Sequence, residues 1–225
     1  MKRKSQGRLL LLLLLLLAAA TLLLYLRQDT PPDYQSDGLL RVCIDAGHGG
    51  DDPGAPDRDR TRFEKDDCLS MALAVETALR ASHPEIEVLL TRTEDTYLKL
   101  DERCAMANDW RADLFVTIHR NSAQSDAQGV EIWIPSGKPA ADKRLAQAIF
   151  DGLKAVGVSK ARGVKGGTAA NPSSDYYVLG HTDMPSCLIE LGFMTNAEDN
   201  ALLDRHHNAY AQAIADAIAD TLLAQ

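Results

Sequence analysis

The chain has 225 residues and a formal net charge of −8; 45% of the residues are hydrophobic and 25% are charged. This composition is typical of a globular protein and excludes a disordered one. The charge is unevenly distributed: residues 1–27 hold five basic residues and no acidic one, which leaves 19 basic and 32 acidic residues in the rest, a net of −13. Because nucleic-acid binding requires positive surfaces that neutralise phosphates, a domain this acidic is not expected to bind nucleic acid.

The N-terminal segment predicts export. The basic stretch MKRKSQGR precedes a charge-free run from Leu9 to Leu26, which is at the short end of what spans a bilayer as a helix. A basic flank stays inside, so the domain that follows is expected to be extracytoplasmic. Two interpretations stay open: residues 1–26 are either an uncleaved signal-anchor or a signal peptide whose removal gives a secreted protein. Residues 27–39 are predicted to be a linker, and residues 40–225 a single domain.

Strands and helices alternate along this domain. Apolar residues at helical spacing indicate the helices, and short runs of apolar and β-branched residues indicate the strands. In chain order we predict a strand at 41–47, a helix at 64–80, a strand at 86–93, a helix at 101–110, strands at 113–119 and 129–135, a helix at 140–156, strands at 175–180 and 185–193, and a helix at 198–224. This order predicts an α/β fold: a mostly parallel central sheet flanked by helices on both faces, preceded by the N-terminal apolar helix.

Chemically active side chains collect at the ends of the predicted strands. His48 follows the first strand within a glycine turn, His119 ends the strand from 113, and Glu190 lies near the end of the strand from 185. In α/β sheets ligands bind beyond the carboxyl ends of the strands. Two imidazoles and one carboxylate can hold Zn²⁺ and leave a position for water, while a second carboxylate handles the proton. Glu64, which starts the first helix, is the other candidate carboxylate, and spacing alone does not say which of the two is the ligand.

Several segments also occur together, in this order, in one enzyme family. The chain resembles the zinc-dependent N-acetylmuramoyl-L-alanine amidases of the amidase-3 type over about residues 41–223. The segments that carry the resemblance are IDAGHGGDDPGA, FEKD, RTEDTYLKLDERCAMAN, ADLFVTIHRNS, RGVK and CLIELGFMTNAED.

The resemblance implies a site and a reaction. His48, Glu64 and His119 would be the zinc ligands, and Glu190 the general base and acid. The reaction would be hydrolysis of the amide between N-acetylmuramic acid and L-alanine in peptidoglycan, for cell-wall remodelling or cell separation. Peptidoglycan would then be the partner of this chain, with the membrane reached through the N-terminal helix, and a monomer is expected.

Some assignments stay open at this point. Arg120 departs from the family pattern, which often has a small residue there, and it either contacts the substrate or points to solvent. Asp45 either orients a ligand histidine or caps a turn, and Arg103 and Arg162 either form salt bridges or contact substrate. His181 belongs either to a plain loop or to the rim of the site.

Two further questions are not decided by the sequence. The four cysteines form no CxxC pair and lie in apolar runs, so both buried thiols and disulfides are compatible with them. The alternative functions are a catalytically silent peptidoglycan-binding module and a zinc peptidase that acts within the stem peptide.

Overall fold

The structure is a computed structural model that describes residues 38–124 and 126–224. The predicted signal segment at 1–26 and nearly all of the predicted linker lie outside the described residues. Within the described part of the chain, no helix is both long and apolar enough to cross a membrane. The described residues from Leu39 onward belong to one compact unit, which holds the α/β fold.

Six strands form one sheet with the order β2-β1-β3-β6-β4-β5. The four strands β2, β1, β3 and β6 are parallel, whereas β4 is antiparallel to β6 and parallel to β5, so the sheet is mostly parallel. The bounds are β1 Leu40–Ala46, β2 Ile86–Leu90, β3 Leu114–Asn121, β4 Val130–Ile134, β5 Ala161–Gly166 and β6 Ser186–Phe193.

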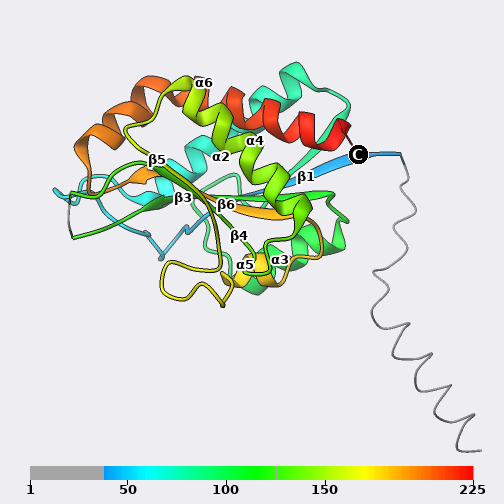
Figure 1. The fold of residues 1–225 in the computed structure, drawn as a ribbon, viewed down its shortest axis with the longest axis horizontal. Coiled ribbons are helices and arrows are strands. Elements are labelled where there is room, and N and C mark those ends of the chain that lie inside the picture. The colour runs from blue at the N-terminus through cyan, green and yellow to red at the C-terminus, as the bar shows by residue number, and fades with distance from the viewer. Residues whose placement is uncertain (1–37, 125, 225) are drawn as a thin grey trace, which may run out of the picture. The chain divides into compact units, whose positions relative to one another are not determined.

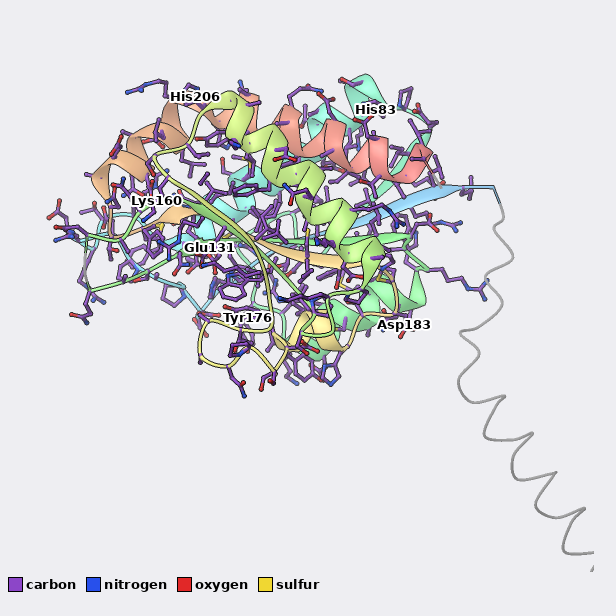
Figure 2. The ribbon with its side chains drawn as sticks, in the orientation of Figure 1. His83, Glu131, Lys160, Tyr176, Asp183 and His206 are labelled. Carbon is purple, nitrogen blue, oxygen red and sulfur yellow. The ribbon has the colours of Figure 1, made fainter. Side chains whose placement is uncertain are left out.

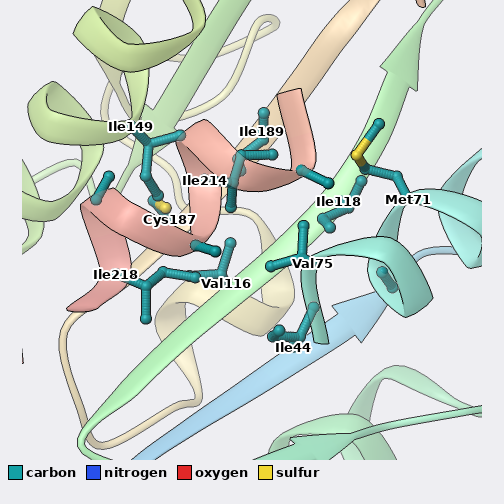
Figure 3. Packing of buried hydrophobic residues seen from close by; sticks show 14 of the residues in the cluster. Ile44, Met71, Val75, Val116, Ile118, Ile149, Cys187, Ile189, Ile214 and Ile218 are labelled. Atoms are coloured by element: carbon teal, nitrogen blue, oxygen red, sulfur yellow. The ribbon is translucent and has the colours of Figure 1, made fainter. Parts of the chain in front are cut away.

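Helices cover both faces of this sheet, as predicted (Figure 1). The helical elements are α2 Glu64–Ser82, α3 Leu100–Asp109, α4 Ala140–Val156, α5 Tyr177–Gly180 and α6 Ala197–Leu223. The larger hydrophobic core joins α2, α4 and α6 to one face of the sheet (Figure 3). A smaller core packs α3 and α5 on the other face. Successive strand residues alternate between these two faces.

The sequence prediction was wrong for residues 175–180. This segment is not a strand, because residues 177–180 form the short helix α5, in which the amide of Gly180 donates to the carbonyl of Tyr176 at 3.1 Å. The aromatic pair Tyr176–Tyr177 favours a strand by propensity, but Val178 and Leu179 are both buried against the second core, which a strand with one buried face cannot achieve.

Strand β5 was not predicted. Its sequence ARGVKG contains two glycines and two cations, and none of its residues is fully buried. It forms the edge of the sheet, where the strand signal in a sequence is weakest.

All four cysteines are buried free thiols: Cys43, Cys68, Cys104 and Cys187. Burial raises the pKa of each thiol, so these side chains act as small apolar groups of the core.

Candidate metal centre

The first candidate ligand, His48, lies just beyond the carboxyl end of β1 in a strained turn. Its φ of 60° is in the left-handed region that non-glycine residues rarely adopt. The turn is closed by backbone hydrogen bonds between Gly49 and Asp52, and the His48 Nδ1 atom lies 2.8 Å from Asp52 Oδ2. This contact leaves the Nε2 atom to face the site. Strain of this kind persists only where neighbouring groups hold it in place.

Two arginine side chains hold this turn by its backbone. Arg103 donates to the carbonyl of Ala46 at 2.7 Å and to that of His48 at 2.7 Å. Arg92 donates to the carbonyl of Ala46 at 2.9 Å and to that of Gly47 at 2.8 Å. Two buried arginines therefore fix three consecutive backbone carbonyls, which end with that of His48. Sequence reasoning left the role of Arg103 open and did not find Arg92.

Asp45 anchors one of these arginines. Its carboxylate lies 2.7 Å from Arg103 Nη1 and accepts hydrogen bonds from Thr117 at 2.6 Å and Thr91 at 2.7 Å. Burial by itself would raise the pKa of Asp45, but the Arg103 charge and these hydrogen bonds lower it below its ordinary value. Asp45 therefore stays ionised, and it supports the His48 turn through Arg103 rather than by contact with the imidazole.

The second candidate ligand, Glu64, begins α2 and reaches over the end of the sheet. Its Oε1 atom lies 3.1 Å from His48 Nε2 and 3.0 Å from His119 Nδ1. The amides of Arg120 and Ala55 donate to its two oxygens at 3.0 Å and 2.9 Å. Burial opposes ionisation, but the hydrogen bonds from the two imidazoles hold the pKa of Glu64 well below its ordinary value. Glu64 is therefore a carboxylate, the form that a metal ligand needs.

His119, on β3, completes a cluster with these two residues. One possible ligand atom from each of His48, Glu64 and His119 lies within 4.8 Å of the others. The two imidazole centroids are 4.9 Å apart and nearly perpendicular. A Cβ atom on Gly47 would overlap the His119 ring, so only glycine permits this approach. Two imidazoles and a carboxylate form a donor set that fits Zn²⁺ and leaves a fourth position for water.

Glu190 lies beside this cluster, and one of its two carboxyl oxygens has no hydrogen-bond partner among the described residues. It pairs with His119 in the register of β3 and β6, and this oxygen, Oε2, is buried. Burial raises the pKa of Glu190 well above its ordinary value, and the charges of Glu64 and Glu131 raise it further. A buried, unpaired carboxyl oxygen is costly. Its position indicates a group reserved for something that enters the site.

Glu131 is a neighbour that sequence reasoning missed. It lies opposite Glu190 on β4 and is buried. Arg162 and Lys165 on β5 both pair with it, and this explains how a carboxylate can be buried there. Figure 2 shows Glu131 and, on the α5 side of the sheet, Tyr176. The ion pair with Glu131 is the role that the structure gives to Arg162.

The cluster opens into a pocket of about 450 Å³. His48, His119 and Glu190 line it together with residues from the loop before α3, from α3 and from α5. The figure also places His83 and His206 on the opposite helical layer, away from this pocket (Figure 2).

Arg120 is not among the residues that line the pocket. Its side chain is buried, pairs with Asp67 and donates to Asn200 Oδ1 at 2.6 Å. Strand alternation explains this placement: His119 faces the pocket, so the next side chain faces the α2 and α6 layer. The geometry therefore does not support a contact between Arg120 and the substrate. The alternation of side chains along a strand could have indicated this from the sequence, because Arg120 directly follows His119.

A site of this kind at the strand ends of an α/β sheet defines a metal-dependent hydrolase. Residues 42–222 match the Amidase_3 family, described as N-acetylmuramoyl-L-alanine amidase, and the chain belongs to this family.

Three relatives illustrate the match. The chain is 38% identical over 178 residues to YqiI of Bacillus subtilis (strain 168), which covers 79% of this chain and 80% of that protein. It is 38% identical over 179 residues to the N-acetylmuramoyl-L-alanine amidase LytC of the same organism, which covers 78% of this chain but 34% of LytC. The solved catalytic domain of the amidase CwlV from Bacillus (Paenibacillus) polymyxa var. colistinus superposes with a TM-score of 0.74 and 36% identity, over 83% of this chain and 100% of that domain.

Proposed function

We propose that this chain hydrolyses the amide bond between N-acetylmuramic acid and L-alanine in peptidoglycan, with Zn²⁺ held by His48, Glu64 and His119. The observation that carries the proposal is the buried, unpaired Oε2 atom of Glu190 beside this cluster. Family membership supports the same reaction. The process served would be cell-wall remodelling or cell separation outside the membrane, with residues 1–26 as signal-anchor or signal peptide.

Glu190 would move the proton in this reaction. A bound Zn²⁺ supplies polarisation of the scissile carbonyl and acidifies water. Glu190, as a carboxylate, takes a proton from the attacking water as the new carbon–oxygen bond forms. It then gives that proton to the alanine nitrogen as the carbon–nitrogen bond breaks, which yields the lactyl carboxylate and a free amine. Burial and the neighbouring carboxylates raise the pKa of Glu190 in the metal-free protein, and a bound cation would lower it again, which favours the carboxylate that accepts the proton.

The remaining residues would keep the site in shape. Glu64 is oriented by two backbone amides, and the His48 turn is fixed by Arg92 and Arg103. Such supporting contacts tune metal affinity and ligand geometry. Arg120 would contribute to this support through its backbone amide and its buried ion pair.

The test is digestion of purified peptidoglycan by the full-length chain, with and without a chelator, and identification of the products by mass spectrometry. The matched variants are Glu190→Gln and Glu85→Gln, the second at an exposed position at the start of β2. Free stem peptides that begin with L-alanine, lost with the chelator and with Glu190→Gln but not with Glu85→Gln, are the expected result. Cuts within the peptide would identify a peptidase instead. A folded, zinc-loaded protein that releases nothing would be a silent binding module.

A further inference from the structure

Exposed apolar side chains gather at the mouth of the pocket. Five large apolar residues are exposed among the described residues, and three of them line this pocket: Tyr97, Leu100 and Tyr177, with 52%, 52% and 42% of their surface exposed. We call these two tyrosines and the leucine beside them the aromatic rim. Leu98, Tyr176 and Val178 extend the same wall toward Glu190. Clustered apolar exposure beside a catalytic site marks a surface that binds something.

The aromatic rim is held in place on the α5 side. The Tyr177 ring stacks on His181 with centroids 3.9 Å apart and planes 7° from parallel. His181 Nδ1 lies 2.8 Å from the carbonyl of Tyr177, and Asn108 donates to the carbonyl of His181 at 3.0 Å. One face of Tyr177 is therefore occupied by a fixed partner. His181 does not line the pocket itself, and it supports the rim through its contact with Tyr177.

The rim is also tied to the metal centre on the β1 side. The amide of Gly50, two residues after His48, donates to Asp95 Oδ1 at 2.7 Å. Lys65 binds Asp95 at 2.6 Å and the carbonyl of Gly50 at 3.0 Å. A Cβ atom on Gly50 would lie 2.8 Å from the amide nitrogen of Tyr97, so the two loops are in close contact. The distance between the rim and the metal centre is thus set by packing.

The charges near the rim are mainly acidic. The rim residues are uncharged, Asp52 lines the same pocket, and segment 94–102 carries four acidic residues and one lysine. The one arginine in the lining, Arg103, is buried and paired with Asp45. Residues 177–183 add Asp183 and no lysine or arginine. The cations Arg162 and Lys165 lie on β5, at the far edge of the sheet from β1, where both pair with Glu131 and outnumber it by one charge. A ligand that carries carboxylates would be repelled from the rim.

From this asymmetry we infer that the aromatic rim is a subsite for the neutral N-acetylated sugar rings of the glycan strand, and that the stem peptide leaves the site on the β4–β5 side. The inference rests on the proposed function, which puts a sugar on one side of the scissile amide and a carboxylate-bearing peptide on the other. The C–H groups on one face of a pyranose chair form an apolar surface that packs against a flat aromatic side chain. An uncharged aromatic surface among acidic groups suits that half of the substrate.

The first test compares steady-state kinetics of the full-length, zinc-loaded chain on soluble uncrosslinked glycan strands that carry stem peptides. Tyr97→Ala and Tyr177→Ala are each expected to raise KM about fivefold with kcat nearly unchanged, as for a lost aromatic contact. Tyr177→Phe keeps the ring and should behave like the wild type, whereas Tyr177→Leu keeps apolar volume without a flat face and should behave like Tyr177→Ala. Leu223→Ala, at an exposed leucine outside the pocket, is the control.

The second test measures binding without turnover. A peptide-free tetramer of β-1,4-linked N-acetylglucosamine is titrated into the Glu190→Gln protein by calorimetry, with and without Tyr177→Ala. Binding that Tyr177→Ala weakens supports the inference. An unchanged KM for glycan strands in both alanine variants, or no binding of the tetramer, would overturn the inference. If the wild type still hydrolysed the amide, the proposed function would stand. If the tetramer bound but the wild type did not cleave the amide, the sugar subsite would stand and the proposed function would fail.

Discussion

Replacing Glu190 by glutamine should stabilise the metal-free protein while abolishing activity. In the folded chain the Glu190 carboxyl group is buried, its Oε2 atom lacks a partner, and its pKa is raised. Between the unfolded and the folded pKa the native state binds more protons than the unfolded state, so stability falls as the pH rises through that range. Glutamine has nearly the same shape and no charge. Glutamine leaves a polar atom at the same unpaired position, so the gain comes only from removing the charge. Burying a charge costs more than the roughly 1–3 kcal/mol of a neutral polar group, and we expect a gain of about 2 kcal/mol near neutral pH.

The assay is thermal unfolding of metal-free wild type and Glu190→Gln. A gain of about 2 kcal/mol corresponds to a Tm increase of about 4–8 °C in a chain of this size. The difference should shrink below about pH 4, where Glu190 is protonated in both states. It should also shrink with zinc bound, because a nearby cation compensates the carboxylate. In the zinc-loaded wild type, amidase activity should fall once the pH is low enough to protonate Glu190. A lower Tm for the variant, or a gain independent of pH, would refute this account of Glu190.

Four further outcomes follow from the same geometry. Arg103→Met removes the hydrogen bonds that fix the His48 turn, so the zinc Kd from chelator competition should rise at least about tenfold, with Arg103→Lys in between. Gly47→Ala puts a Cβ atom into the His119 ring and should lower zinc stoichiometry measured by metal analysis, whereas Gly137→Ala, with open space around it, should not. Zinc at 100 times its Kd should stabilise the apo protein by about 2.7 kcal/mol in thermal unfolding, and an unchanged Tm would contradict the metal site. Arg120→Met removes the ion pair with Asp67, which keeps Arg62, and the hydrogen bond to Asn200, and it should cost about 1.5–3 kcal/mol in denaturant unfolding; a raised KM with unchanged stability would restore the substrate contact.

Much of the fold could be predicted because its elements carry local signals. The helix predicted at 140–156 coincides with α4, and the predicted strand at 113–119 covers most of β3. Segment 161–166 gave no such signal, because a glycine-containing edge strand is defined by its partner β4 rather than by its own residues. The strand order was also beyond local patterns: β6 inserts between β3 and β4, and only the assembled sheet decides this.

The candidate site could also be predicted only in part. His48 and His119 could be found because both follow strands, and parallel strands gather their carboxyl ends at one edge. Residue types alone did not separate Glu64 from Glu190. The structure groups Glu64 with the imidazoles, because α2 carries it over the sheet edge, and leaves Glu190 on its strand with its Oε2 atom unpaired. Glu131 was missed because its burial depends on two cations from β5, more than 30 residues later in the chain.

The dispersed origin of the metal-binding atoms has a consequence for how the protein folds. Glu64 and His119 are 55 residues apart in the chain, and they meet only once β3 lies beside β1 and α2 has packed on the sheet. Closing so long a loop costs entropy, and strand pairing and core packing offset that cost. The metal ion does not offset it, because it cannot hold ligands that have not yet been brought together. Zinc would therefore bind a preformed site late in folding, leaving the refolding rate unchanged and slowing unfolding.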